Sequence, residues 1–140
     1  MVFKFLEEEA TADIAFTAQN PSINGLFEDC AKALFETMVD TSLVKQKREK
    51  KLSLKAESVE KLLYNFLQEL VFLKDVEYTV YSGFKVKVDE TKNSLEAVLN
   101  GEPIDQTKHG FREDVKAVTL HLFELKKSGN NWTAKVLLDV

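Results

Sequence analysis

The chain has 140 residues, which fits one domain over residues 1–140 and leaves no room for a second of ordinary size. Hydrophobic residues make up 44% of the chain and only five glycines and two prolines occur, which excludes an intrinsically disordered chain. The formal net charge of −4 argues against direct binding to nucleic acid, because neutralising phosphates requires a basic face.

The first half of the chain combines strand and helix patterns. Residues 11–19 alternate apolar and polar side chains, as a half-buried strand does. Apolar residues at steps of three and four predict one amphipathic helix over residues 23–38, with Ser22 as N-cap. The same spacing predicts a second helix over residues 59–73 that begins at Glu57 or Ser58.

Between the two helices lies the only block of basic residues, from Lys45 to Lys51. It lacks the interleaved aromatic residues that stack on bases, so we interpret it as a solvated, lysine-rich edge strand. Contact with RNA or with an acidic partner is the alternative for this block.

The second half of the chain reads as strands over residues 84–89, 94–100, 115–125 and 132–138. Residues 118–123 are apolar on both faces, which predicts a central strand. The last two strands form a hairpin through residues 128–131. The fold class is therefore α+β: one domain with a mostly antiparallel or mixed sheet and two amphipathic helices packed on it.

Cysteine use and the N-terminal residues bear on the compartment. Cys30 is the only cysteine, so an internal disulfide and a Cys/His zinc set are both excluded. It lies on the apolar stripe of the first helix and is interpreted as a core residue. The N-terminal residues quickly become acidic, from Glu7 on, and lack the basic region and long apolar stretch of a signal peptide; no run of about 18 apolar residues occurs. We expect a cytoplasmic protein that does not contact membranes.

Asp13 and Asp139 are candidate ligands for a metal ion. Each lies in a segment that is otherwise small or apolar, where a carboxylate needs a partner. If the strand that holds Asp13 lies beside the last strand, both carboxylates converge with the terminal carboxylate of Val140. Three oxygen donors favour Ca²⁺, Mg²⁺ or Mn²⁺ over Zn²⁺. The alternatives are a capping role for Asp13 and a solvent-exposed chain end for Asp139.

Three further side chains are candidates for chemistry. His121 shares a strand face with apolar residues and His109 follows the turn-rich residues 101–105, so each is more often a structural histidine than a ligand. Lys116 lies near the start of the most apolar strand. It is either an exposed strand-end charge or a group that neutralises a carboxylate or a phosphate.

Five segments, taken together, resemble the archease family, and the resemblance covers nearly the whole chain in order. They are Thr11-Ala12-Asp13-Ile14, residues 62–70, residues 101–105 with Lys108 and His109, residues 115–121, and residues 136–140. The first looks like the His-Thr-Ala-Asp signature of archeases. The last two resemble the family's final strands and are the most specific.

The resemblance implies a function that the residues alone do not. Archeases assist the RtcB-type ligase, which joins 2′,3′-cyclic-phosphate and 5′-hydroxyl RNA ends in tRNA splicing and RNA repair, by promoting its GTP-dependent guanylylation and its turnover. This implies an accessory protein rather than an enzyme, one that meets RNA only indirectly. It also implies a bound divalent cation, with Ca²⁺ the first choice.

By motif position, the metal ligands fall on Asp13, Asp139 and Val140, and the family's activating lysine falls on Lys116. Asp105, His109 and His121 lie in the matching segments and are candidates for contact with the partner.

Three positions depart from the family pattern. Ala10 replaces the signature histidine, Ala15 replaces a glycine, and Leu120 replaces the aromatic residue before His121. Metal affinity or partner choice can therefore differ from that of relatives. Two other functions remain open: a small metal-dependent phosphate-ester hydrolase that uses the same carboxylates, and a chaperone-like binding module.

Overall fold

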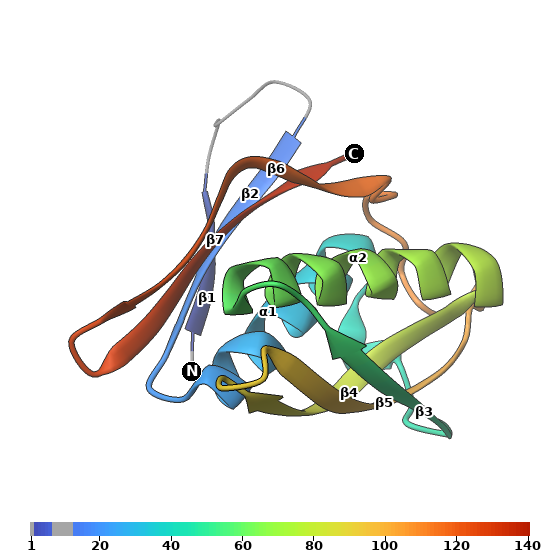
Figure 1. Cartoon of the computed structure of the whole chain (residues 1–140). Coiled ribbons are helices and arrows are strands. Elements are labelled where there is room, and N and C mark those ends of the chain that lie inside the picture. Colours follow the sequence, from blue (N-terminus) through green and yellow to red (C-terminus); the bar gives the residue numbers. More distant parts are fainter. Residues whose placement is uncertain (1, 7–12) are drawn as a thin grey trace.

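The computed structural model describes residues 2–6 and 13–140, and it confirms the α+β class (Figure 1). The elements in chain order are β1 (Val2–Leu6), β2 (Asp13–Asn20), α1 (Ile23–Met38), the short 3-10 helix η1 (Thr41–Leu43), β3 (Arg48–Lys55), α2 (Val59–Glu77), β4 (Thr79–Asp89), β5 (Ser94–Pro103), β6 (Ala117–Ser128) and β7 (Asn131–Asp139).

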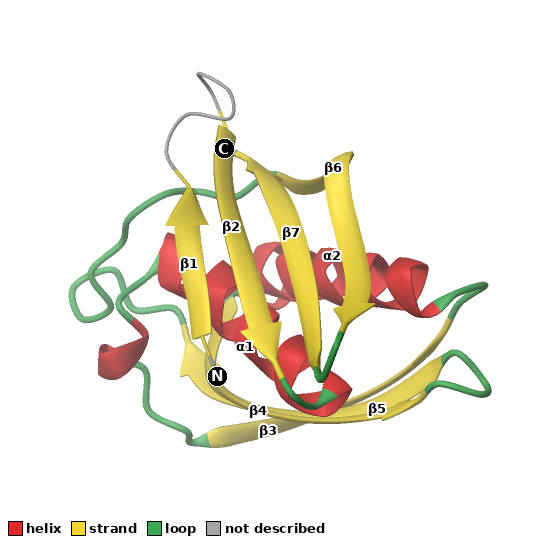
Figure 2. Cartoon of the chain, turned by 90° about the vertical axis from the view of Figure 1, so that its left-hand side faces the viewer, coloured by secondary structure: helices red, strands yellow, loops and turns green. Residues whose placement is uncertain are grey.

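The strands form two antiparallel sheets, where the sequence predicted one. Four strands pair in the order β1-β2-β7-β6 and three in the order β3-β5-β4. Both helices lie between the sheets (Figures 1 and 2). Among the described residues no strand of one sheet contacts a strand of the other, because α1 contacts β2 and β4, and α2 contacts β6 and the three-stranded sheet. Each helix therefore buries more than one face.

The helices begin where the sequence predicted and supply most of the core. The side chains of Ser22 and Ser58 accept hydrogen bonds from the N–H groups of Gly25 and Lys61, as N-caps do. Eleven of the sixteen residues of α1 are buried, Cys30 among them, which confirms Cys30 as a core residue. The largest fully buried side chains include Phe16, Phe27, Phe35 and Phe66.

Polar side chains of both helices cover sheet edges. Glu28 and Asn24 of α1 accept hydrogen bonds from the N–H groups of Val86 and Val88 on β4. Gln68 and Glu60 of α2 do the same for Val118 and Leu125 on β6. An uncovered edge offers unpaired donors to other chains, so these contacts close part of each edge.

Strand β6 lies at the edge of its sheet, which corrects the prediction of a central strand. Its pairing with β7 shifts register between Thr119 and Glu124. Residues 120–123 bulge out there, and Leu122 takes a left-handed backbone conformation with φ of 58°. Leu120 and Leu122 are consequently exposed, so the apolar run at residues 118–123 reflects this bulge and not burial on two faces.

Three more segments refine the predicted boundaries. Strand β5 runs to Pro103, so Gly101 and Glu102 belong to a strand and not to a loop. Strand β1, to which the sequence analysis assigned no element, pairs with β2. Strand β3 is an edge strand, as predicted for the basic segment, although Lys45 and Lys47 precede it. No helix in the described part of the chain is long and apolar enough to span a membrane.

Candidate functional site

The two candidate carboxylates lie opposite each other on the central strands of the four-stranded sheet. Strands β2 and β7 pair antiparallel with Asp13 in register with Asp139. Directly opposed residues project from the same face, with Cβ atoms about 4.5–5.5 Å apart. Both residues are half-buried. The strand that holds Asp13 and the last strand are thus neighbours, as the convergence of the two carboxylates requires.

Such a pair of like charges is unfavourable unless something neutralises it. Among residues 2–6 and 13–140, no lysine, arginine or histidine forms an ion pair with either carboxylate. Lys116 is attached to the same strand end, because its backbone N–H donates to the carbonyl oxygen of Asp139 at 2.8 Å. The Lys116 side chain is exposed. Asp13, Asp139 and Lys116 therefore meet at one end of three neighbouring strands.

The donor set at this end of the sheet suits a hard cation. Val140 follows Asp139 directly, and its half-buried side chain packs against the core. Within the described residues no three His, Cys, Asp or Glu side chains form a group that could hold a metal ion. A cation bound here would find two side-chain ligands in the pair, and main-chain oxygen and water would have to complete an all-oxygen set of the kind that Ca²⁺ and Mg²⁺ accept.

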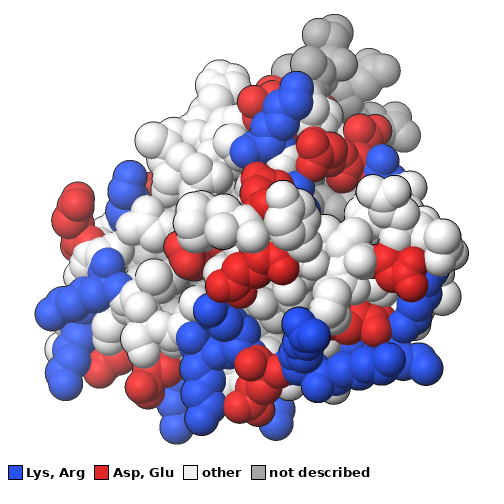
Figure 3. Space-filling model, turned by 90° about the vertical axis from the view of Figure 1, so that its right-hand side faces the viewer, with Lys and Arg blue, Asp and Glu red and all other residues white. Residues whose placement is uncertain are grey.

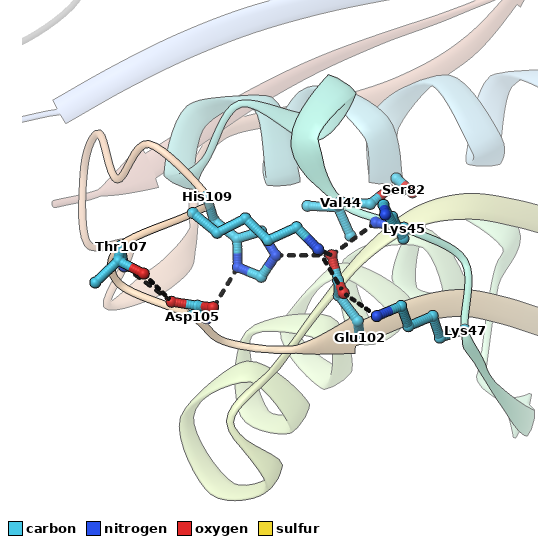
Figure 4. A network of polar contacts seen from close by, with 9 residues as sticks. Val44, Lys45, Lys47, Ser82, Glu102, Asp105, Thr107 and His109 are labelled. Carbon is cyan, nitrogen blue, oxygen red and sulfur yellow. Dashed lines mark hydrogen bonds and ion pairs between the residues drawn. The ribbon is translucent and has the colours of Figure 1, made fainter.

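His109 and Asp105 lie in a separate network at the start of the segment from 104 to 116, which joins β5 to β6 (Figure 4). The imidazole is fully buried. Its Nδ1 accepts the N–H of Asp105 at 3.0 Å, so Nε2 carries the proton and donates to Glu102 Oε2 at 2.9 Å. Asp105 in turn accepts hydrogen bonds from the N–H and hydroxyl of Thr107.

Glu102 is the centre of this network, and sequence reasoning missed it. Lys108 Nζ donates to both of its oxygens at 2.9 and 2.7 Å, and the backbone N–H of Lys45 donates at 2.8 Å. The hydrogen bonds from Lys108, His109 and Lys45 lower the pKa of Glu102 to about 2. The one available signal in the sequence was that Lys108 and His109 follow Glu102 by six and seven residues.

These contacts give His109 and Asp105 a structural role, since they tie the segment to β5 and to the residues before β3. None of their described contacts reaches Asp13 or Asp139. A direct part for either residue in partner binding stays a prediction. The same holds for His121, which is exposed on the β6 bulge beside Leu122.

The basic residues do not form an uninterrupted patch. Lysine and arginine side chains gather along the lower part of the face in Figure 3, where they alternate with carboxylates. Three lysines of the basic segment are paired: Lys50 with Glu77 at 3.1 Å, Lys47 with Glu102 at 3.9 Å and Lys51 with Glu49 at 4.0 Å. This pattern fits a solvated edge.

Fold and site together define a class of protein: a small α+β domain whose central strands end on an opposed carboxylate pair with a lysine beside it. Residues 3–140 match the model of the Archease protein family (MTH1598/TM1083). The protein archease of Methanothermobacter thermautotrophicus is 39% identical over 140 residues, covering 99% of this chain and 98% of the relative. The protein archease of Pyrococcus abyssi is 36% identical over 135 residues, 94% and 95% of the two chains. The chain belongs to the archease family.

Two solved structures support the fold. The solution structure of Methanobacterium thermoautotrophicum protein 1598 has a TM-score of 0.85 and 38% identity, covering 99% of this chain and 98% of that one. The crystal structure of a Thermotoga maritima archease, described as a possible chaperone, has a TM-score of 0.68, 23% identity and 96% coverage of both chains. The latter similarity concerns the fold alone.

Proposed function

We propose that this protein is an accessory activator of an RtcB-type RNA ligase in the cytoplasm, and that it holds a divalent cation on Asp13, Asp139 and Val140. The observation that carries the proposal is that Asp13 lies directly opposite Asp139 on paired strands, in a member of the archease family. The backbone N–H of Lys116 is hydrogen-bonded to Asp139 at the same strand end. The carboxylates are separated by strand pairing and not by a loop, so their spacing is fixed before any partner arrives.

Each residue has a distinct part in the proposed mechanism. Asp13 and Asp139 bind the cation side by side, and Val140 keeps its main-chain oxygen in place by packing against the core. A bound divalent cation neutralises charge that develops on a phosphoryl group, which is what guanylylation requires. Lys116 presents its ammonium group to the partner's nucleotide or to a carboxylate at the entrance of its active site. RNA is then met only through the ligase.

Cation binding is tested on the isolated protein. Calorimetric titration with Ca²⁺, Mg²⁺ and Mn²⁺ is expected to show one site, with Ca²⁺ bound most tightly, and Asp13→Asn and Asp139→Asn are expected to lose it. Glu96→Gln removes the same charge from an exposed position on the other sheet and serves as the matched control. Unchanged affinity in both aspartate variants would contradict the site.

The carboxylate pair also makes a prediction about stability without metal. In chelator, Asp13→Asn is expected to raise the free energy of unfolding by roughly 0.2–1 kcal/mol, because it removes a like-charge pair. With saturating cation the native protein should be more stable than Asp13→Asn, since only the protein with both aspartates gains stability from binding. Urea denaturation with and without cation measures both effects.

A chaperone-like binding module is the second candidate. Phe72 and Val76 lie one turn apart on α2, with 55% and 54% of their surface exposed. The T. maritima relative is described as a possible chaperone. If this function is correct, Phe72→Ser abolishes the suppression of client aggregation, whereas Asp13→Asn leaves that suppression intact. The activator proposal predicts the opposite pattern for RNA joining.

A further inference from the structure

Helix α2 contacts the chain at three successive points, one just before β6 and two within β6. Lys74 Nζ lies 2.7 Å from Asp114 Oδ1 and 3.5 Å from the carbonyl oxygen of Val115. One and a half turns earlier, Gln68 Oε1 accepts the N–H of Val118 at 2.7 Å. Nearer the start of the helix, Glu60 Oε2 accepts the N–H of Leu125 at 3.1 Å. The helix and the strand therefore run antiparallel, and Lys74 and Gln68 hold the chain on either side of Lys116.

Lys74 is an unusual residue in this position. It is 7% exposed, and a buried lysine requires partners for its charge. Burial lowers the pKa of Lys74, but hydrogen bonds to Asp114 and Asp75 outweigh burial and keep that pKa above its ordinary value. Both partners are accessible to solvent, with 81% and 50% of their side chains exposed. Since neither carboxylate is buried, the contact serves to hold the chain in place at Asp114.

The main chain at Lys116 has little other support. Residues 104–116 contain no helix or strand, and β6 begins only at Ala117. The pairing of β6 with β7 is then interrupted between Thr119 and Glu124. On its C-terminal side, Lys116 is held by its own N–H bond to Asp139 and by the short pairing that follows. On its N-terminal side the chain is held by the N–H groups of Arg112 and Glu113, which donate to carbonyl oxygens at the end of α1. It is then held by Val115, which is fully buried and whose carbonyl oxygen lies 3.5 Å from Lys74 Nζ.

We propose that Lys74 is a positioning residue for Lys116: by fixing Asp114 and Val115, it sets where the Lys116 side chain stands relative to the Asp13–Asp139 pair. The proposal rests on the activator function proposed above, and it assigns to α2 a part in that function. Lys74 does not touch the cation or the partner. It acts through the main chain of residues 114–116.

The test is a double-mutant cycle in a multiple-turnover RNA-joining assay with the cognate ligase. Lys74→Met keeps the apolar stem of the side chain and removes its charge, and Lys116→Ala removes the side chain that it positions. We expect each single variant to lower the activation about tenfold to a hundredfold. In the Lys116→Ala background, Lys74→Met should lower the activation no further, because its effect on activation passes through Lys116.

Two controls separate positioning from general destabilisation. Glu60→Ala removes the corresponding contact between α2 and β6 beyond the bulge, so it loosens the same helix–strand contact and should nevertheless activate normally. Lys74→Arg can renew the ion pair with Asp114 and should restore most of the activation. Calcium affinity should be unchanged in Lys74→Met, because Asp13 and Asp139 are held by the pairing of β2 with β7.

The outcomes are distinguishable from failure of the proposed function. If Asp139→Asn and Lys116→Ala lower activation as expected and Lys74→Met does not, Lys74 has no positioning role and the activator function stands. Additive losses in the double variant would also overturn the proposal, as would a loss in Glu60→Ala equal to that in Lys74→Met. If Asp139→Asn and Lys116→Ala both activate fully, the activator function fails and the role of Lys74 fails with it. If Lys74→Met does not fold, Asp114→Asn carries the same test from the exposed side of the ion pair.

Discussion

His109 and Glu102 share a buried hydrogen bond, with 2.9 Å between Nε2 and Oε2 and no exposed surface on the imidazole. The bond links the end of β5 to the segment that carries the chain across to β6. That segment ends at Lys116, beside the carboxylate pair. The network in Figure 4 therefore anchors one end of the segment whose other end enters the candidate site.

The network predicts a defined dependence of stability on pH. The pKa of Glu102 is lowered from 4.5 to about 2 in the folded protein, so ionised Glu102 stabilises the fold above pH 4.5. This contribution is lost as the pH falls from 4.5 through about 2. Glu102→Gln should therefore be clearly less stable than the native protein at pH 7, and the difference should shrink below pH 4.5.

Urea denaturation between pH 7 and pH 3 measures this difference. Glu96→Gln, at an exposed position on the same strand, should differ little from the native protein across the range. A difference for Glu102→Gln that stays constant down to pH 3 would contradict the role assigned to the ionised carboxylate.

Gly101 is required because the neighbouring strand lies against its Cα. A Cβ at this position would lie 2.0 Å from the carbonyl oxygen of Val80 and 2.7 Å from the Cα of Tyr81. The backbone of β4 cannot move aside without breaking its pairing with β5, so Gly101→Ala should lower the free energy of unfolding by about 3 kcal/mol. Gly129→Ala is the comparison, since that turn glycine has open space around it and a φ of +61°. It should cost only about 1 kcal/mol of backbone strain, and equal losses in the two variants would contradict the steric argument.

Cys30 should be unreactive in the folded protein. The thiol is fully buried in α1, and burial raises its pKa far above the ordinary value, so almost no thiolate is present at neutral pH. Labelling with a chromogenic disulfide reagent should follow the rate of global unfolding and accelerate with urea in the same proportion. Labelling as fast as that of a free thiol in native buffer would mean that α1 opens locally.

The sequence predicted the parts of the fold that depend on local pattern. Both helices and their serine caps follow from apolar spacing and N-cap chemistry. The convergence of Asp13 and Asp139 required that their two strands be neighbours, and β2 does pair with β7. Family membership could be recognised because the matching segments occur in order along nearly the whole chain.

The parts that failed depend on contacts distant in sequence. A helix stripe does not reveal whether one sheet or two will cover it, so the division into two sheets was missed. The bulge in β6 was mistaken for a strand buried on both faces, because Leu120 and Leu122 are apolar although they are exposed. Glu102 and Lys74 became visible as site-supporting residues only when partners 57 and 40 positions away were placed beside them. Ala10, which replaces the signature histidine, lies outside the described residues.

The central claim is that the carboxylate pair of Asp13 and Asp139 enables this protein to activate an RNA ligase. The most direct measurement is multiple-turnover RNA joining by the cognate RtcB-type ligase, with added Ca²⁺ or Mn²⁺ and the native protein, Asp13→Asn, Asp139→Asn or the control Glu96→Gln. The account predicts strong activation by the native protein and by Glu96→Gln, and loss of activation in both aspartate variants, with their folding confirmed by urea denaturation. Full activation by folded Asp13→Asn and Asp139→Asn would contradict it.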